Sequence, residues 1–376
     1  MKVPLLDLKA QYKPLREETR KYLDDILDSQ YFIGGPYVAK LEDEAAAYCN
    51  TKAAIGMSSG TDALLASLMA IGISPSPIVK DEIPEVILPT YTFFATAGCV
   101  WRAGAKPVFV DIDKDTYNID VDAIEAKITS RTKAIMPVHL YGQCANMEKI
   151  CEIAKKYNLA VIEDGAQAIG AMRGGVKVGN FGLCGCLSFF PSKNLGGLGD
   201  GGMVVTNDLD FADKLRQMRN HGMEPRYYHK FVGGNFRLDA IQAAGLLVKL
   251  PHLDKWGQMR RANAAKYDTA FATEEKIKTP YIEPVNYSIY NQYIVSVDNR
   301  DDVIAYLRSK DIGCEIYYPV PLHCQECFAQ LGYKKGDFPN AEYAAEHTIA
   351  LPIYPELEPE QIAYVADTLK EAVAKF

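Results

Sequence analysis

The chain has 376 residues, 48% of them hydrophobic and 24% charged, and carries a formal net charge of −7 at pH 7. This length exceeds the size at which a single hydrophobic core usually stops growing, so we expect two domains. The hydrophobic content excludes a disordered or fibrous chain, and the acidic balance argues against a surface for nucleic acid or anionic membranes. A small molecule is therefore the favoured partner.

Cysteine usage and the apolar segments indicate the compartment. The nine cysteines are scattered, and the N-terminal residues show no apolar run behind a basic segment. An odd number of dispersed cysteines is typical of a reducing environment, so we expect a cytoplasmic protein without a signal peptide. The apolar stretch LDAIQAAGLLVKL is short and charged at both ends, so we expect no membrane-spanning segment.

Residues 53–206 alternate short β-branched runs with helical patterns. We interpret seven runs as buried strands, namely AAIGM, VILP, PVFV, AIMPV, AVIED, LSFFP and MVVT. Apolar periodicity between them predicts helices at Thr61–Ile71, Val121–Ile128 and Met147–Tyr157. This alternation predicts an α/β fold in which a mostly parallel sheet lies between layers of helices.

The pattern changes after Arg237. Helical patterns cover Leu238–Leu250 and Leu253–Phe271 and meet at Pro251; beyond them we expect strands at Tyr293–Val297 and Cys314–Tyr318, a helix at Asp301–Lys310 and a closing helix from Pro359. We therefore expect a large domain over residues 1–250, whose N-terminal segment packs on the other domain, and a small C-terminal α+β domain over residues 251–376. Without a low-complexity linker, the two should pack closely.

Lys193 is presented on a turn in SFFPSKNLGGLGDGG, between a strand and a glycine-rich stretch that cannot form a regular helix. A lysine that loses its proton near neutral pH forms Schiff bases with carbonyl compounds, and in pyridoxal-phosphate (PLP) enzymes this is how the cofactor is attached. From this segment alone, a solvated surface lysine is an equally good interpretation.

Asp164 ends the strand LAVIED, and ligands of open parallel sheets bind at the carboxyl ends of strands. A carboxylate there can pair with the pyridine nitrogen of the same cofactor, and Gln167 can reach the ring's phenolic oxygen. The alternative is that Asp164 caps the next helix.

Two further loops complete the pattern. SSGTDAL opens a helix, where free N–H groups of Gly60 and Thr61 can bind phosphate with help from the Ser188 hydroxyl, although an ordinary N-capped helix fits equally well. In PTYTFFATAGC, Phe93 is our candidate for stacking on a flat ring. Core packing of at least one of its aromatic residues is the alternative.

We expect no metal site. His323, Cys324 and Cys327 have the spacing of half a zinc site, but no second pair completes it. Cys184 and Cys186 share one face of a strand, so we expect both in the core.

With these segments in order, the chain resembles the DegT/DnrJ/EryC1/StrS family of sugar aminotransferases, which are fold-type I PLP enzymes. The matching motifs are YFIGGP, SSGTDAL, PTYTFFATA, VFVDIDKDTYNID, PVHLYGQCANM, EDGAQAIGA, SFFPSKNLGGLGDGG, GGNFRLDAIQAA and YYPVPLH. The likeness runs nearly end to end. It implies a large domain with a seven-stranded, mostly parallel sheet.

The resemblance also implies pyridoxal 5′-phosphate as the cofactor and assigns roles to residues. They are Lys193 as Schiff-base lysine and proton shuttle, Asp164 on the pyridine nitrogen, Gln167 near the phenolic oxygen, Phe93 on the ring, and Gly60, Thr61 and Ser188 at the phosphate. Asn235 would reach the phosphate of the neighbouring subunit in a homodimer. Tyr31, Phe32, Arg237 and the segment Tyr317–His323, in which Tyr317 and His323 are the candidates, would bind substrate.

The implied reaction moves an amino group from an amino acid, by family habit L-glutamate, to a nucleotide-linked keto-sugar used in cell-surface polysaccharide or lipopolysaccharide synthesis. The likeness is greatest to members that aminate C3 of UDP-linked N-acetylated keto-sugars or their uronic acids. C4 amination and dTDP-linked deoxysugars stay open. A dehydratase is disfavoured because dehydratase relatives carry histidine where this chain has Lys193. A regulatory homologue without activity is a further alternative.

Overall fold

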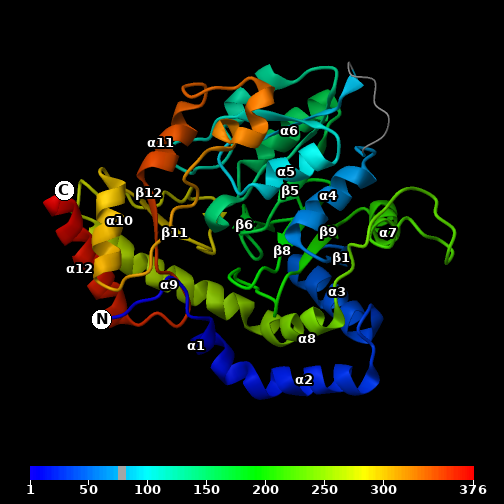
Figure 1. Ribbon diagram of the computed structural model, residues 1–376, viewed down its shortest axis with the longest axis horizontal. Helices are drawn as coiled ribbons and strands as arrows, with labels where there is room; N and C mark the ends of the chain where they lie inside the picture. Colours follow the sequence, from blue (N-terminus) through cyan, green and yellow to red (C-terminus); the bar gives the residue numbers. More distant parts are fainter. Residues whose placement is uncertain (75–81) are drawn as a thin grey trace.

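The computed structural model describes residues 1–74 and 82–376. A seven-stranded sheet forms its centre (Figure 1). The strand order is β1 (Ala53–Met57), β9 (Gly202–Thr206), β8 (Cys184–Ser188), β5 (Ala160–Asp164), β4 (Thr132–Ile135), β2 (Glu85–Pro89) and β3 (Lys106–Val110). The predicted α/β fold with a seven-stranded, mostly parallel sheet is confirmed.

Because most strands of the sheet run in the same direction, the loops that follow them lie at one edge of the sheet. β3, β2, β4, β5 and β8 pair in parallel, whereas β9 is antiparallel to both of its neighbours, β8 and β1. β9 runs opposite to β8, and β1 runs opposite to β9, so β1 has the same direction as β8 and the other parallel strands. The carboxyl ends of six strands therefore lie at the same edge of the sheet, where open α/β sheets bind ligands.

Alternation along the strands covers both faces of this sheet. Val86 and Leu88 pack toward α4 (Gly60–Ala70) and α5 (Ala95–Arg102), whereas Ile87 between them packs toward α6 (Met147–Tyr157). In the same way, Ala54 faces α3 (Gly35–Cys49) and α8 (Ala240–Lys249). Apolar residues on both faces explain why the strands appear in the sequence as continuous hydrophobic runs. α7 (Leu209–Met218) packs beside α4.

Glu163 and Asp164 are adjacent polar residues of β5, so their side chains point to opposite faces of the sheet. Glu163 is fully buried, and its carboxylate accepts hydrogen bonds from the backbone N–H groups of Gly179 (2.8 Å), Phe181 (2.9 Å) and Gly182 (2.8 Å). The His139 Nε2 lies 3.0 Å from Oε2, the carboxylate oxygen that also accepts from Gly179. Glu163 thus fixes the loop that leads into β8, while Asp164, the next residue, points to the opposite side of β5.

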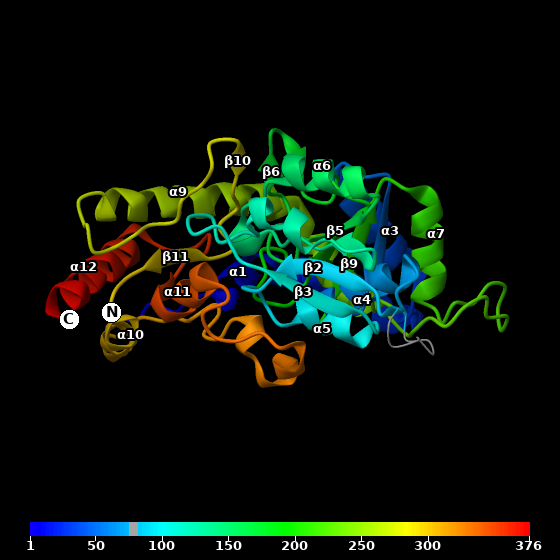
Figure 2. The ribbon, with the colours of Figure 1, turned by 90° about the horizontal axis from the view of Figure 1, so that it is seen from above.

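The C-terminal part is a second, smaller core. β11 (Tyr293–Ser296) pairs antiparallel with β12 (Thr348–Leu351), and these strands pack with α9 (Leu253–Phe271), α10 (Arg300–Ser309) and α12 (Pro359–Lys375). α9 runs from the large sheet into this part (Figure 2). Val3 joins the same core and forms a parallel bridge with Ile312.

The remaining elements are short or peripheral. They are α1 (Leu8–Tyr12), α2 (Arg16–Ser29), α11 (Pro339–His347), β6 (Met172–Arg173), β7 (Val176–Lys177) and β10 (Asn286–Tyr287). No helix in residues 1–74 or 82–376 has the length and apolar character needed to cross a bilayer.

Two predicted elements are wrong, and a third, the strand LSFFP at residues 187–191, is displaced because β8 ends at Ser188. Residues 121–128 form two 3-10 turns, Val121–Ala123 and Glu125–Lys127, because the Asp120 carboxylate caps the first and Ile128 is extended. Residues 314–318 form no strand beyond one bridge between Glu315 and Ala350. There the Tyr317 carbonyl accepts hydrogen bonds from tyrosine side chains in place of a neighbouring strand.

Candidate active site

Four chain segments meet at the carboxyl edge of the sheet. They are the turn from β1 into α4, residues 90–96 after β2, residues 164–167 after β5 and residues 188–193 after β8. Each carries candidates that the sequence singled out. The parallel strands, which fix all four segments at one edge, therefore position the site.

Lys193 lies on a turn that its own backbone helps to close, because its N–H donates to the Phe190 carbonyl (2.8 Å). The residue is partly buried. Burial lowers the pKa of Lys193 to about 8, and the carboxylate of nearby Asp164 opposes this shift. A substantial fraction of its amine is therefore neutral near pH 7 to 8, unlike that of a solvated surface lysine.

This pKa gives a testable pH dependence. Only the neutral amine attacks an aldehyde, so the rate at which Lys193 bonds to added pyridoxal phosphate should rise with pH and level off above about 8. Stopped-flow absorbance measures this rate. An ordinary lysine, with a pKa of about 10.4, would give a rate that still climbs between pH 9 and 10, and that outcome would contradict the environment described here.

Asp164 is buried and faces the same site. Its Oδ2 accepts a hydrogen bond from the Thr96 hydroxyl (2.8 Å), and its Oδ1 accepts one from the Ala166 N–H (3.2 Å). Burial raises the pKa of Asp164, whereas these hydrogen bonds and the charge of Lys193 lower it. The residue does not cap a helix, because a turn follows β5. Its carboxylate is thus held where a ligand with a cationic nitrogen would pair with it.

Gln167 and Phe93 reach this place from different strands. Gln167 is buried; its Oε1 accepts from the Tyr141 N–H (2.7 Å), and its Nε2 donates to the Tyr318 hydroxyl (3.0 Å). The ring centroids of Phe93 and Tyr318 lie 5.9 Å apart. Phe93 is 56% exposed, so one side of its ring is free to stack on a flat ligand. The alternative, packing in the core, is correct for Tyr91, whose side chain is 1% exposed.

The turn into α4 is shaped to receive an anion. Ser59 caps the helix by accepting from the Asp62 N–H (3.0 Å), and the first N–H groups of the helix, those of Gly60 and Thr61, have no intrahelical acceptor. A Cβ on Gly60 would lie 2.7 Å from the Cβ of Ser188. Because the turn and the end of β8 are in contact, the Ser188 hydroxyl lies beside these N–H groups.

The substrate candidates Tyr31, Phe32 and Arg237 lie near one another. The segment after α2 pairs with residues 237–240, since Ile33 bridges to Asp239 and the Phe32 carbonyl accepts from Ala240. Arg237 donates to the Asn220 side chain (2.8 Å), and its Nε is buried without a partner. A cleft of about 310 Å³ is lined there by Ile33, Gly34, Val38, Arg216, Arg219, Asn220, Arg237 and Leu238. The Tyr31 side chain is exposed, and its ring lies next to Gly35.

Tyr317 is partly buried beside the aromatic cluster of the site, and its carbonyl accepts from the Tyr91 hydroxyl (2.8 Å). His323 is different and requires a correction. It is 2% exposed; its Nδ1 lies 2.8 Å from the Thr90 hydroxyl, and its Nε2 lies 3.1 Å from the Glu342 carboxylate. With both ring nitrogens engaged inside the protein, His323 does not line a sugar-binding groove.

Asn235 is exposed, and its backbone pairs with that of Asn220. It belongs to the segment between α7 and α8, residues 219–239, part of which projects away from the body (Figures 1 and 2). This placement leaves its side chain accessible to another molecule.

Thr96 and Tyr318 belong to the site although the sequence did not single them out. Thr96 lies in a helical segment, and nothing in the spacing shows that its hydroxyl faces a residue 68 positions away. Tyr318 lies in the predicted segment 317–323, but its link to Gln167 depends on the tertiary fold.

Comparison with known proteins gives relatives along the whole chain. A pleiotropic regulatory protein of Geobacillus stearothermophilus is 49% identical, with 100% of both chains covered. UDP-N-acetyl-3-dehydro-alpha-D-glucosamine 3-aminotransferase of Acidithiobacillus ferrooxidans is 43% identical, covering 99% of this chain and 98% of the relative. dTDP-3-amino-3,4,6-trideoxy-alpha-D-glucose transaminase of Streptomyces venezuelae is 40% identical, covering 98% and 96%.

Solved structures agree with these relatives. DesV of S. venezuelae, in complex with a ketimine intermediate, superposes with a TM-score of 0.94 at 40% identity and covers 98% of both chains. NtdA of Bacillus subtilis, with the bound cofactor PMP, gives a TM-score of 0.90 at 30% identity, covering 99% of this chain and 85% of the other. A family model matches residues 13–370. The chain thus belongs to the DegT/DnrJ/EryC1/StrS aminotransferase family.

Proposed function

We propose that this aminotransferase moves the amino group of L-glutamate to C3 of a UDP-linked N-acetylated 3-keto-hexose or its uronic acid, for cell-surface polysaccharide or lipopolysaccharide synthesis. The juxtaposition of Lys193 and Asp164 at the carboxyl edge of the sheet supports transamination most strongly. A reactive lysine beside a buried carboxylate is what amino-group transfer through a carbonyl cofactor requires.

The cofactor of this enzyme is pyridoxal 5′-phosphate. When bound, it supplies a carbonyl for the amino group and a ring that withdraws electrons from the substrate carbon. The site fits this group, because the aromatic face of Phe93, the Asp164 carboxylate and the Gly60–Thr61 turn offer stacking, charge pairing and phosphate binding respectively. We assign these contacts, and those of Gln167 and Ser188, to the cofactor.

Each side chain then has a distinct task. Lys193 would hold the cofactor through its Nζ, and the same amine would move a proton at the substrate carbon. Asp164 would pair its carboxylate with the ring nitrogen and so favour the protonated form of that nitrogen. Thr96 orients Asp164 by donating to its Oδ2. The Gly60–Thr61 turn anchors the phosphate and thus fixes the register of the ring.

We propose a UDP-linked acceptor from a comparison of two relatives. The 3-aminotransferase named for a UDP-linked sugar is 43% identical to this chain, whereas the transaminase named for a dTDP-linked sugar is 40% identical. The cleft at Arg237 offers guanidinium groups for the two phosphates of a nucleotide sugar. Tyr31 and Phe32 lie beside this cleft and Tyr317 lies across the site, so we assign all four residues to substrate binding.

We further propose a cytoplasmic homodimer in which Asn235 completes the neighbouring active site. The exposure of the Asn235 side chain supports this arrangement, as does the projection of part of the segment between α7 and α8, near whose ends Asn235 pairs with Asn220. We keep the cytoplasm as the proposed compartment because the nine dispersed cysteines form no disulfide framework. Light scattering should give twice the 41.7 kDa chain mass.

A substrate panel tests the reaction. Holoenzyme and L-glutamate are offered UDP- and dTDP-linked 3-keto and 4-keto sugars while 2-oxoglutarate is measured. We expect turnover with the UDP-linked N-acetylated 3-keto-sugar, and NMR of the product should place the new amine on C3. Preference for a dTDP-linked acceptor would overturn the carrier, and absence of turnover with every acceptor would overturn the proposed activity.

A regulatory role is the second candidate, because the relative that is 49% identical is named a pleiotropic regulatory protein. The presence of Lys193 and Asp164 in one site favours catalysis over a purely regulatory function. Cofactor binding without turnover across the whole panel would favour regulation instead.

A further inference from the structure

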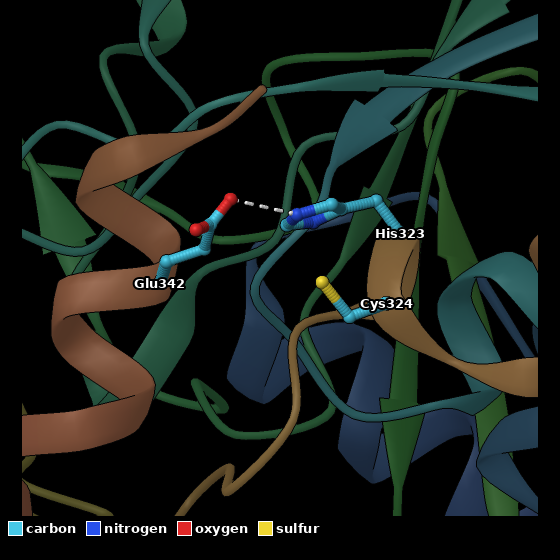
Figure 3. Close-up of side chains that lie close together, drawn as sticks. All are labelled: His323, Cys324 and Glu342. Atoms are coloured by element: carbon cyan, nitrogen blue, oxygen red, sulfur yellow. Dashed lines mark hydrogen bonds and ion pairs between the residues drawn. The ribbon is translucent and has the colours of Figure 1, made fainter. Parts of the chain in front are cut away.

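His323 and Glu342 form a pair that the proposed reaction does not use. His323 lies in the 3-10 helix Leu322–Cys324, and Glu342 lies in α11, so the pair joins two separate elements (Figure 3). Cys324 projects into the same space. Ligand atoms of all three side chains lie within 4.8 Å of one another, the one such group of three in residues 1–74 and 82–376.

A hydrogen bond at Nδ1 orients the imidazole of His323. Its Nδ1 lies 2.8 Å from the Thr90 hydroxyl, which leaves Nε2 aimed at Glu342 (Figure 3). Histidines that bind metals are oriented in this way by a hydrogen bond at the other ring nitrogen. A hydroxyl can donate or accept, so Thr90 supports the tautomer with a proton on Nε2 as well as the one that leaves Nε2 free for a cation.

Glu342 is held equally well. Its Oε1 accepts from the backbone N–H groups of Gly336 (2.7 Å) and Phe338 (3.4 Å) as well as facing the histidine. These donors fix the carboxylate without occupying Oε2. An oriented imidazole and an oriented carboxylate are thus already in place beside a thiol, and only the Cys324 side chain is exposed enough to move.

The spacing suits a tetrahedral cation. Zn²⁺ binds histidine nitrogen and carboxylate oxygen at about 2.0–2.1 Å, which separates two such atoms by about 3.3 Å. The Nε2 to Oε1 distance in His323 and Glu342 is 3.1 Å. For a thiolate bound at about 2.3 Å, sulfur and nitrogen lie about 3.6 Å apart. The ligand atoms of Cys324 and His323 lie within 4.8 Å of each other, so the thiol has to approach by about 1.2 Å at most.

We propose that His323, Cys324 and Glu342 form a site for a thiophilic divalent cation such as Zn²⁺, with water as the fourth ligand. Binding converts the Cys324 thiol to thiolate and shifts the His323 proton to Nδ1, so one proton leaves per cation. The thiolate and the carboxylate together carry two negative charges, which the cation neutralises. Of the three residues that the sequence shows as half a zinc site, His323 and Cys324 are joined by Glu342 in place of Cys327.

The cation would tie α11 to the segment after residue 321. Thr90, which holds His323, follows β2 three residues before Phe93. The site therefore lies behind the loop that carries the aromatic candidate and clamps the fold without facing Lys193. This property is independent of the sugar that the enzyme accepts.

Metal binding by the EDTA-treated holoenzyme tests the proposal. Zn²⁺ is titrated against a chromophoric chelator, and we expect one tightly bound Zn²⁺ per chain, with one proton released when calorimetry is compared across buffers. Cys324→Ser and Glu342→Gln should each weaken binding at least about a hundredfold, because loss of a residue that merely orients a ligand already costs roughly ten- to a hundredfold.

Cys327→Ser is the matched control, since Cys327 is an exposed thiol three residues away and outside the group. It should retain wild-type affinity. Co²⁺ added to the wild type should give ligand-field bands at wavelengths longer than those of the cofactor, which requires no variant to fold. Absence of stoichiometric binding or of these bands, or binding that is unchanged in Cys324→Ser, would overturn the site.

Discussion

Replacing Lys193 with arginine is expected to abolish transamination, by about a thousandfold or more, since both the cofactor attachment and a proton transfer worth roughly 10²–10⁴ are lost. Arginine preserves the positive charge and fits a partly buried turn whose backbone bond to Phe190 is unaffected. The absorbance band of the lysine-bound cofactor should disappear. Steady-state release of 2-oxoglutarate measures the activity, and circular dichroism verifies that the fold is retained.

A second lysine provides an internal control for this result. Lys249 is buried, its pKa is also lowered by burial, and it donates to the Gly196 carbonyl (2.6 Å). Borohydride reduction of the wild-type holoenzyme, followed by peptide mapping, should label Lys193 and leave Lys249 unmodified. Labelling of Lys249, or activity in Lys193→Arg near that of the wild type, would show that the attachment site is elsewhere.

Replacing Asp164 with asparagine is expected to give a folded enzyme that binds the cofactor but reacts slowly. The amide keeps the shape and can still accept from Thr96, but it lacks the charge that keeps the ring nitrogen protonated. We expect the half-reaction with glutamate to slow by roughly a hundred- to a thousandfold, the usual effect of losing one preorganised electrostatic partner. Single-turnover absorbance measures this rate.

Asp208→Asn is the matched control for this variant. Asp208 also follows a strand, but β9 runs in the opposite direction, so Asp208 lies at the other edge of the sheet, where it caps α7. Asparagine caps helices as well as aspartate does, so this variant should keep full activity. A rate in Asp164→Asn close to that of the wild type would contradict the role proposed for Asp164.

The sequence predicts the sheet well because its strands are buried on both faces. Continuous runs such as AAIGM and MVVT match β1 and β9, and the pattern of Met147–Tyr157 matches α6 residue for residue. Cys184 and Cys186 lie in the core as expected. The order of strand ends along the chain then places Lys193 and Asp164 at one edge, since parallel strands share their carboxyl ends.

The errors come from contacts that spacing does not encode. Cys314–Tyr318 has the composition of a strand, but the Tyr317 carbonyl and the Tyr318 N–H bond to tyrosine hydroxyls from distant segments. His323 lies next to polar and cysteine residues, yet the packing of Thr90 and Glu342 around it makes it a buried residue. Thr96 acquires its role only when α5 is placed beside β5.

Glu163 and Asp164 are adjacent carboxylates with opposite functions, and this has a genetic consequence. Loss of Glu163 removes the acceptor of three backbone N–H groups, of which that of Gly179 is buried and those of Phe181 and Gly182 are partly buried, so the subunit would be destabilised and its allele would be recessive. A subunit with Asn at 164 would still fold and, in the homodimer proposed above, would enter mixed dimers and contribute Asn235. Because this intact Asn235 completes the active site of the wild-type partner, each mixed dimer would keep one working site of its two, and the wild-type copies would lose no output.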